Sequence, residues 1–306
     1  MGKKVADQLV ETICRAGIRH IYAVTGDSLN EVNDAVRRAG TVRWVHVRHE
    51  ESGAFAAAAE SELNGIACCA GSSGPGHVHL INGLYDAHRS NCPVLAIAST
   101  CPSDQFGTGY FQETDPIRLF DDCSGYNQMA VTPAQFARML PAALQHAIHR
   151  REVAVVGLPG DVAASPCAES PGASGPLPSH GIYRPLDGEL RQLAEMIGSA
   201  ERITVFCGIG AREAHDEVVR LAAMLKAPVA YTFKAKMEVQ YDNPYEIGMT
   251  GLLGLPSAYG AMHESDLLLL LGTDFPYDCF LPSECRIAQV DIRPERIGRR
   301  ARVELG

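Results

Sequence analysis

The stretch GIACCAGSSGPGHVHLINGLYDAHRS, residues 65–90, carries one complete strand–turn–helix unit. Its opening part, GIACCAG, is a short continuous apolar run, which is typical of a strand buried on both faces of a parallel sheet. The glycine-rich turn GSSGPG follows at residues 71–76 and opens a helical pattern over residues 77–90. Because cysteine behaves as a small hydrophobic residue in such runs, Cys68 and Cys69 are predicted to be buried and reduced.

The same alternation continues on both sides of this unit. Helical patterns cover residues 4–17 and 134–149, an alanine-rich helix begins near residue 50, and an irregular loop follows residue 100. The other apolar runs of this block that predict strands are HIYAVTG (20–26), VRWVHVRH (42–49), PVLAIAST (93–100) and VAVVGLP (153–159). Strands that alternate with helices in this way form an open parallel sheet.

A second block follows residues 164–187, which are rich in proline, glycine and serine and have the composition of a linker. The strand patterns of this block are ITVFCG (203–208), PVAYTF (228–233), DLLLLLG (266–272) and RIAQVDI (286–292), again with helical patterns between them. The sequence therefore predicts an α/β protein of two open parallel-sheet domains, residues 1–163 and 188–306, the second with a Rossmann-like layout.

The composition excludes several classes of function. A formal net charge of -9 argues against a nucleic-acid or anionic-membrane partner. The sequence has no run of about 18 apolar residues, and its N-terminus shows an amphipathic helix pattern where a signal peptide would have an apolar segment. The 10 cysteines lack zinc-site spacing, and the pair His77 and His79 is interpreted as helix surface and contact, not as metal ligands. We expect a cytoplasmic protein without metal ligands in this chain.

Four polar or glycine-rich stretches of the first block follow predicted strands, where ligands of parallel sheets bind. The turn at residues 71–76 offers backbone N–H groups to an anion or a polar ring, but it lacks the Lys-Ser/Thr ending of a phosphate-binding loop. Glu50 and Glu51 stand at the start of the alanine-rich helix, where the helix dipole alone explains one carboxylate. The four stretches are VTGDS (24–28), RHEES (48–52), GSSGPG (71–76) and FGTGYFQET (106–114).

Taken in order, long segments of the chain resemble the thiamine-diphosphate enzymes of the pyruvate oxidase and acetolactate synthase superfamily, and most of all its flavin-containing, quinone-linked pyruvate dehydrogenase (pyruvate oxidase) branch. The resemblance covers nearly all 306 residues. The segments that carry it are VTGDSLN, RHEESGAFAAAAE, CAGSSGPGHVHLINGLYDAHRS, PVLAIAST, GYFQETDP, LPGDVA, YDNPYEIGMTGLLG, LLLLLGTDFPY and AQVDIRPERIG.

The resemblance implies a catalytic role for Glu50. In this family the glutamate of the Arg-His-Glu segment hydrogen-bonds a pyrimidine nitrogen of thiamine diphosphate and exchanges a proton with it, which promotes loss of the thiazolium C2 proton. An apolar surround favours the protonated carboxyl that this exchange needs. Glu51 is assigned to the helix cap. The resemblance also implies that Phe111 and Gln112 lie beside the thiazolium and the substrate. The expected cofactor-binding residues are Thr25, Gly26, Glu50, Ser73, Gly74, Pro75, Gly76 and Asn82.

In the second block the resemblance implies an FAD site. The turn CGIGAR at residues 207–212 lacks the last glycine of a dinucleotide-binding fingerprint, because Glu213 stands there, so the motif alone is weak. The alternative to an FAD site is that this chain is like those relatives that keep the domain but have lost the flavin. The expected FAD-binding residues are Gly208, Gly210, Ala211, Gly251, Leu252, Leu253, Gly254, Thr273, Asp274, Phe275 and Asp291.

Members of this family have a third domain, which binds the cofactor diphosphate through Mg²⁺ with a Gly-Asp-Gly segment that this sequence lacks. We therefore expect a fragment that is inactive by itself, or else one chain of a split enzyme. The complete protein is expected to be a homodimer or homotetramer that converts pyruvate to acetate and CO2 and passes electrons through FAD to a quinone. Acetolactate synthesis, non-oxidative decarboxylation and a non-catalytic assembly or regulatory module are the alternatives.

Overall fold

The computed structural model describes residues 2–168 and 181–306 and divides into two compact units, Met1–His180 and Gly181–Gly306. Both units contain an all-parallel sheet covered by helices, which confirms the predicted fold class. The middle of the linker predicted at residues 164–187 lies outside the described residues. None of the helices within those residues is long and apolar enough to cross a bilayer.

The first unit is built on a 6-stranded sheet with the order β2-β1-β3-β4-β6-β5. The order reverses between β1 and β3, and this reversal opens a crevice at the carboxyl ends of those two strands. β4 and β6 are buried along their whole length, as continuous apolar runs predict. The strands are β1 (His20–Ala23), β2 (Arg43–His46), β3 (Ala67–Gly71), β4 (Val94–Thr100), β5 (Tyr126–Met129) and β6 (Val153–Pro159).

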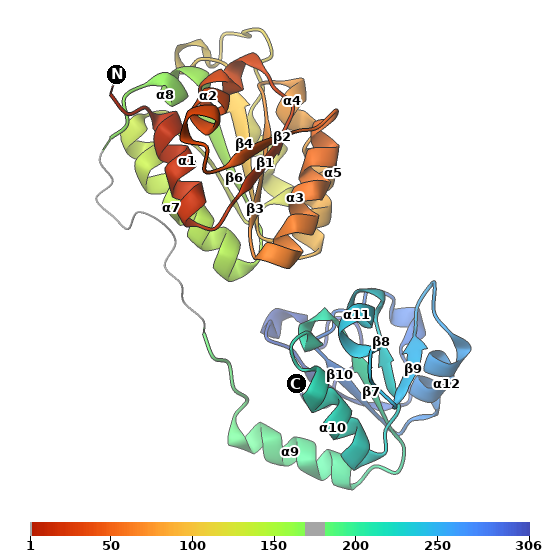
Figure 1. Ribbon diagram of the computed structural model, residues 1–306. Coiled ribbons are helices and arrows are strands. Elements are labelled where there is room, and N and C mark those ends of the chain that lie inside the picture. The colour runs from red at the N-terminus through yellow and green to blue at the C-terminus, as the bar shows by residue number, and fades with distance from the viewer. Residues whose placement is uncertain (1, 169–180) are drawn as a thin grey trace. The chain divides into compact units, whose positions relative to one another are not determined.

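Helices cover both faces of this sheet (Figure 1). One face packs against α1 (Val5–Arg15), α2 (Asn30–Ala39), α7 (Pro133–Arg150) and α8 (Gly160–Ala164). The other face packs against α3 (Glu50–Asn64) and α5 (Ile81–Arg89), and the short helices α4 (Pro75–Val78) and α6 (Pro116–Leu119) follow β3 and β4.

The sequence misplaced two elements of this unit. The single helix expected over residues 77–90 is wrong, because α4 ends at Val78 and α5 begins at Ile81. β5 lies in the segment expected to be an irregular loop, since Tyr126–Met129 is a short edge strand with a polar sequence. Cys68 and Cys69 are fully buried, as predicted, and burial raises the pKa of the Cys69 thiol to about 12.

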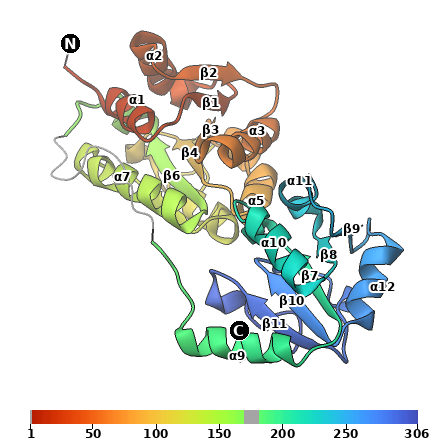
Figure 2. The same ribbon diagram turned by 60° about the horizontal axis from the view of Figure 1, so that its bottom comes forward.

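The second unit is built on a 5-stranded sheet with the order β11-β10-β7-β8-β9. Alternate leucines of β10 enter different cores: Leu267 and Leu269 pack with α10, and Leu268 and Leu270 pack with α12. The ribbons of β7, β10, α10 and α12 can be followed in Figure 2. The strand order reverses between β7 and β10. The elements are β7 (Ile203–Cys207), β8 (Val229–Tyr231), β9 (Glu246–Met249), β10 (Leu267–Leu271), β11 (Arg286–Val290), α9 (Asp187–Gly198), α10 (His215–Leu225), α11 (Lys236–Val239) and α12 (Pro256–Glu264).

Candidate functional site

Three segments of the first unit meet at the crevice between β1 and β3. The backbone N–H of Ser73 in the turn after β3 donates to Ser28 Oγ in the loop after β1, at 2.9 Å. A Cβ atom at Gly26 would lie 2.4 Å from both Cβ and Oγ of Ser72. Only glycine at position 26 therefore allows this close approach of the two loops. Thr25, beside it, is exposed at the same crevice.

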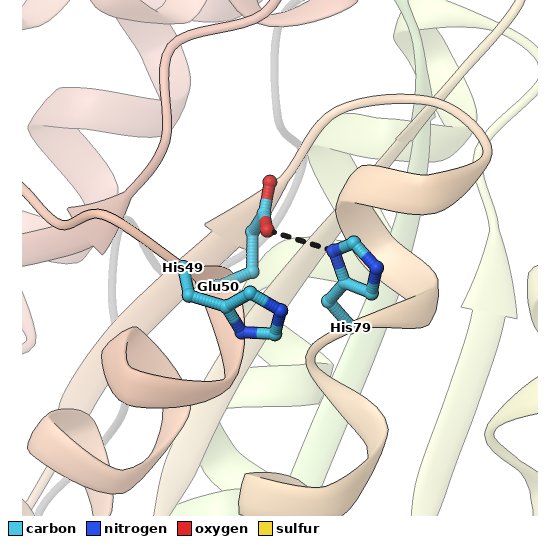
Figure 3. Close-up of side chains that lie close together, drawn as sticks. All are labelled: His49, Glu50 and His79. Atoms are coloured by element: carbon cyan, nitrogen blue, oxygen red, sulfur yellow. Dashed lines mark hydrogen bonds and ion pairs between the residues drawn. The ribbon is translucent and has the colours of Figure 1, made fainter.

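Glu50 enters this crevice from the first turn of α3. Its side chain is buried, with 7% of the residue exposed, and its Oε2 lies 3.1 Å from Nδ1 of His79 (Figure 3). His79 follows α4 directly, so the turn after β3 brings an imidazole to the carboxylate. The helix dipole favours the carboxylate at this position, and the imidazole fixes one of its two oxygens.

The other carboxylate oxygen of Glu50 lies close to Gly76 in the turn after β3. A Cβ atom at Gly76 would lie 2.5 Å from Ser72 Oγ and 3.5 Å from Glu50 Oε1. Among the described residues, no hydrogen bond to Oε1 is formed. A carboxylate oxygen without a partner can accept a hydrogen bond from a ring N–H, and the pyrimidine of thiamine diphosphate fits this arrangement.

His49, Glu50 and His79 together resemble a metal-ligand set by composition and distance. Their donor atoms lie within 4.8 Å of one another. The rings of His49 and His79, however, stack at 4.5 Å with an interplanar angle of 27° (Figure 3). Imidazole lone pairs lie in the ring plane, so nearly parallel stacked rings do not point at one common ion. The cluster is therefore better suited to orienting the carboxylate than to tetrahedral metal binding.

Glu51 has different surroundings from its neighbour. Its side chain is 35% exposed, and its carboxylate accepts a hydrogen bond from Nδ2 of Asn82. Its backbone N–H donates to Nδ1 of His49, which caps α3. These contacts are typical of a residue in the first turn of a helix. The structure places Asn82 on Glu51 and not beside Glu50, and its contact with the cofactor stays a prediction.

The loop expected to reach the substrate folds over the glycine turn. Gln112 Oε1 accepts a hydrogen bond from Ser73 Oγ at 3.3 Å. Gln112 and Gly74 both have left-handed backbones, with φ of 58° and 65°, and a Cβ atom on Gly74 would lie 2.8 Å from Cβ of Gln112. Phe111, next to Gln112, is 75% exposed. The structure thus joins Gln112 to the crevice and leaves the Phe111 ring open to solvent.

This loop has its own internal clamp. The carboxylate of Glu113 accepts hydrogen bonds from the backbone N–H groups of Gly107, Gly109 and Tyr110, at 2.5, 2.8 and 3.1 Å. These donors, that of Gly107 first, hold the pKa of the Glu113 carboxyl below its ordinary value. These hydrogen bonds, all within the loop, hold its backbone in place next to Gln112.

Sequence analysis missed the part played by the histidines. His77 is fully buried, so its interpretation as helix surface is wrong. Its ring nitrogens contact the Ser99 carbonyl at 2.8 Å and Thr114 Oγ1 at 2.5 Å, which ties the turn after β3 to β4 and to the loop. Burial lowers the pKa of His77, against the opposing effect of the Ser99 carbonyl. The available signal was the position of both histidines directly after the GSSGPG turn.

In the second unit, the turns after β7 and β10 touch through their backbones. A Cβ atom at Gly208 would lie 2.3 Å from the Gly272 carbonyl oxygen, and one at Gly210 would lie 2.7 Å from Gly272 Cα. A cavity of about 740 Å³ opens beside this contact, at the switch in strand order. Gly210, Ala211 and Asp291, all predicted to bind FAD, line it.

The other predicted FAD residues lie elsewhere in this unit. Leu252 and Leu253 are 72% and 70% exposed in the loop after β9, between Gly251 and Gly254. Thr273 and Phe275 are buried, and Phe275 packs edge-on against Phe206 with ring centroids 5.3 Å apart. Asp274 forms ion pairs with Arg299 and Arg300 at 3.0 and 3.3 Å. The structure does not bring these residues to the cavity, and their contacts with a flavin stay predictions.

Comparison with known proteins matches both units to one family. Residues 3–119 match the thiamine pyrophosphate enzyme N-terminal TPP binding domain, and residues 190–306 match the thiamine pyrophosphate enzyme central domain. The chain is 50% identical over 305 residues to an "Uncharacterized 42.6 kDa protein in isoamylase 3'region" of Pseudomonas amyloderamosa, covering 99% of this chain and 77% of that protein.

Two relatives with named activities are more distant. The pyruvate oxidase of Lactiplantibacillus plantarum is 32% identical over 299 residues, covering 94% of this chain and 49% of that enzyme. The chloroplastic acetolactate synthase of Arabidopsis thaliana is 30% identical over 312 residues, covering 97% and 46%. The chain thus spans about half the length of these two relatives. From both matched domains and these relatives, the chain belongs to the thiamine pyrophosphate enzyme family and contains its N-terminal and central domains.

Proposed function

We propose that the protein carrying this sequence is a cytoplasmic, thiamine-diphosphate-dependent enzyme that oxidatively decarboxylates a 2-oxo acid, pyruvate, to acetate and CO2. Its electrons pass through FAD to a quinone. The observation that carries the proposal is the Glu50 side chain, whose Oε2 contacts His79 and whose Oε1 lies near Gly76 without a hydrogen-bond partner among the described residues.

Thiamine diphosphate, when bound, supplies a thiazolium carbon that becomes a nucleophile after losing a proton. The chain's own contribution is to control a proton on the pyrimidine ring. Glu50 is placed to share a proton between its Oε1 and a ring nitrogen, since that oxygen has no partner among the described residues.

The loop of residues 106–114 supplies the substrate side of the proposed site. The Gln112 side chain bonds to Ser73 and so has a fixed place at the rim of the crevice. We propose that the Phe111 ring, 75% exposed in this structure, excludes water from a bound 2-oxo acid. Pyruvate fits this role as a small anion with a single methyl group.

The reaction needs an electron acceptor. Pyruvate and one water yield acetate and CO2 with release of two protons and two electrons, and FAD accepts such a pair. The cavity of about 740 Å³ in the second unit falls within the range of about 300–1,000 Å³ seen for cofactor sites. Gly210 allows close approach at its wall, and Asp291 suits an adenosine hydroxyl. We place the cofactor diphosphate and Mg²⁺ on residues outside this sequence, in a homodimer or homotetramer.

Two other reactions share the same use of Glu50. Acetolactate synthesis and simple decarboxylation both consume 2-oxo acids but transfer no electrons to a flavin. A non-catalytic assembly or regulatory module is the alternative from another class. The contact of the Glu50 carboxylate with His79 speaks against that module, because it holds a charged side chain in a defined position at the crevice.

The deciding experiment mixes the purified full-length protein with pyruvate, thiamine diphosphate and Mg²⁺ under anaerobic conditions. Bleaching of the flavin absorbance, followed by reoxidation with a soluble quinone and equimolar acetate and CO2, is the expected result. Acetolactate or acetaldehyde without flavin bleaching would overturn the oxidative reaction and leave the decarboxylase. Absence of CO2 release in any form would favour the non-catalytic module.

A further inference from the structure

His77 is a fully buried titratable residue that the proposed proton chemistry does not use. It lies in α4, where its backbone N–H donates to the Ser72 carbonyl at 2.8 Å. A Cβ atom at Gly71 would lie 2.5 Å from His77 Cα, so only glycine at position 71 lets α4 come this close to the end of β3. The His77 ring packs edge-on against the buried Phe120, with ring centroids 5.9 Å apart. The imidazole is therefore held in one place.

The partners of the His77 ring decide which nitrogen carries the hydrogen. The Ser99 carbonyl, at 2.8 Å from Nδ1, can only accept, so Nδ1 is the donor. Burial lowers the pKa of His77 below its ordinary value of 6.5, so the ring is neutral at about pH 7 and its Nε2 is an acceptor. Thr114 Oγ1, at 2.5 Å, therefore donates to Nε2. A buried histidine thus holds loop residue 114 through a hydrogen bond of defined direction.

Glu113 anchors the same loop from the other side. Its carboxylate accepts the three backbone N–H groups of Gly107, Gly109 and Tyr110, and its own N–H donates to the Tyr110 carbonyl at 2.9 Å. An ionised carboxylate is a strong acceptor for such donors. These contacts close residues 107–113 onto themselves, so the turn that leads to Gln112 has a fixed shape.

Gln112 stands directly before these two anchored residues. Its backbone is left-handed, with φ of 58°, a conformation that a residue other than glycine keeps only when its surroundings hold it there. Ser73 is buried, its N–H donates to Ser28, and its Oγ donates to Gln112 Oε1 at 3.3 Å, which fixes the amide oxygen. The amide nitrogen Nε2 has no hydrogen-bond partner in the part of the chain that the structure describes. The two N–H donors of this nitrogen are left for a ligand.

We propose that His77 and Glu113 are positioning residues that hold the Gln112 amide at the rim of the crevice, ready to donate to the carboxylate of a 2-oxo acid. This inference rests on the proposed function, which makes Gln112 a substrate contact. A donor that is already in place avoids the cost of ordering the loop on binding, so loss of either anchor should weaken substrate binding. Proton exchange at the cofactor should not change, because no hydrogen bond joins either side chain to Glu50 among the described residues.

The first experiment measures backbone amide hydrogen exchange of residues 107–114 by NMR in this chain, without cofactor or substrate. Thr114→Val keeps the shape of the side chain but removes the hydroxyl that donates to His77, whereas Thr114→Ser keeps that hydroxyl. Glu113→Gln keeps the size of the side chain but removes the charge that the backbone N–H groups face. Exchange should become roughly tenfold faster in Thr114→Val and in Glu113→Gln and stay at the parent rate in Thr114→Ser.

The second experiment uses steady-state kinetics of the full-length enzyme. The KM for pyruvate should rise roughly threefold to tenfold in Thr114→Val and in Glu113→Gln, the range expected for one lost hydrogen bond, while kcat and exchange of the C2 proton of thiamine diphosphate stay near the parent values. Thr114→Ser should restore the parent KM. Asp115→Asn is the matched control for the lost charge, because Asp115 caps α6 by accepting the Ile117 N–H at 3.0 Å, and it should leave KM unchanged.

Several results would overturn the proposal. A parent KM in both Thr114→Val and Glu113→Gln would show that the anchors do not serve substrate binding. An equal rise of KM in Thr114→Ser or in Asp115→Asn would reduce the effect to a general disturbance of the loop. Slower C2 exchange with an unchanged KM would assign the two residues to the proton chemistry instead. If the parent enzyme consumed no 2-oxo acid, the proposed function would fail, and the amide exchange of this chain would still decide whether the two anchors hold the loop.

Discussion

The two units share one architecture but differ in what they collect at the switch in strand order. In the first unit the crevice between β1 and β3 gathers Glu50, His79 and Gln112. In the second unit the corresponding place between β7 and β10 gathers glycines whose backbones touch. The parallel sheet provides a crevice in both cases, and only the side chains decide whether that crevice performs proton chemistry or holds a ligand.

The two units also differ in the surroundings of their carboxylates. Glu50 is buried with one oxygen unpaired among the described residues, whereas Asp274, at the end of β10, is neutralised by Arg299 and Arg300. Each oxygen of the Asp274 carboxylate faces an arginine, so neither is free to exchange a proton with a ligand. We therefore expect acid–base catalysis in the first unit, and the second unit to contribute binding.

The largest expected effect comes from Glu50→Gln in the full-length enzyme. The amide keeps the size of the side chain but cannot exchange a proton with the pyrimidine, so exchange of the C2 proton of bound thiamine diphosphate should slow by roughly 10²–10⁴-fold. Hydrogen–deuterium exchange at C2, followed by NMR after acid quench, measures this rate. Folding should change little, because a neutral amide costs no more to bury than a carboxylate.

Glu51→Gln is the control for that variant. Its carboxylate is partly exposed and bonded to Asn82, so the change should cost at most about 0.3–1 kcal/mol of helix-dipole stabilisation and leave C2 exchange unchanged. The opposite pattern, with slow exchange in Glu51→Gln and normal exchange in Glu50→Gln, would exchange the roles of the two glutamates.

The next effect concerns the second unit. Gly272→Ala places a Cβ at a left-handed residue, with φ of 59°, and 2.5 Å from Gly210 Cα. Backbone strain and overpacking together should lower the unfolding free energy of this unit by about 2–4 kcal/mol. Urea unfolding followed by circular dichroism measures the loss, while Trp44 fluorescence reports the first unit separately.

Gly260→Ala is the matched control in α12, where an added Cβ meets nothing within 4 Å. It should stabilise the same unit by about 0.5–1 kcal/mol, because alanine favours the helix. If Gly272→Ala and Gly260→Ala changed the unfolding free energy in the same way, the close contact of the turns after β7 and β10 would not contribute to stability.

A smaller effect depends on pH and belongs to the first unit. Burial lowers the pKa of His77 below its ordinary value of 6.5, so the unfolded chain takes up a proton at a pH where the folded chain does not. The stability that neutral His77 contributes is fully present above pH 6.5 and is lost as the pH falls toward the lowered pKa. His77→Gln should therefore make the fall in unfolding free energy between about pH 7.5 and about pH 5 shallower, as measured by urea denaturation monitored at Trp44. An unchanged slope would mean that His77 is not protected from protonation.

The smallest effect on stability is expected for Leu252→Ser. This side chain is 72% exposed, so the unfolding free energy should change by no more than about 0.5 kcal/mol. A clear loss of flavin during gel filtration of the full-length variant would support the predicted FAD contact. Leu63→Ser, 86% exposed on α3, controls for a lost surface leucine. Equal flavin retention in both variants would remove the loop after β9 from the flavin site.

The sequence predicted those parts of the fold that are buried on both faces. β4, β6 and β10 are continuous apolar runs and were recognised, whereas β5 and β9 were missed. Both missed strands stand at the outer end of their sheet and are only partly buried, so they carry no continuous apolar run. Edge position alone does not explain the two misses, since the edge strand β2 was recognised from the apolar residues of segment 42–49; Tyr126–Met129 and Glu246–Met249 are shorter than that segment and contain fewer apolar residues.

The candidate site was predictable where a motif fixed a residue to a strand end. Glu50 directly follows a strand and opens a helix, and the family resemblance singled it out. The contact of Glu50 with His79 was not predictable, because it joins residues 29 positions apart through the turn after β3. The glycines of the second unit show the opposite case. A glycine that is required for close backbone contact cannot be told apart, in sequence, from a glycine that binds a cofactor.

The strand order of the first unit also has a consequence for the way the chain folds during synthesis. β6 lies between β4 and β5, and β5 pairs with no other named strand. Until Val153–Pro159 has left the ribosome, Tyr126–Met129 has no partner and one edge of β4 stays open. Parallel pairing also allows no hairpin to form early, so every strand must wait for a crossover. The nascent first unit therefore exposes an unsatisfied β4 edge until late in its synthesis, and this is the interval in which a chaperone would be needed most.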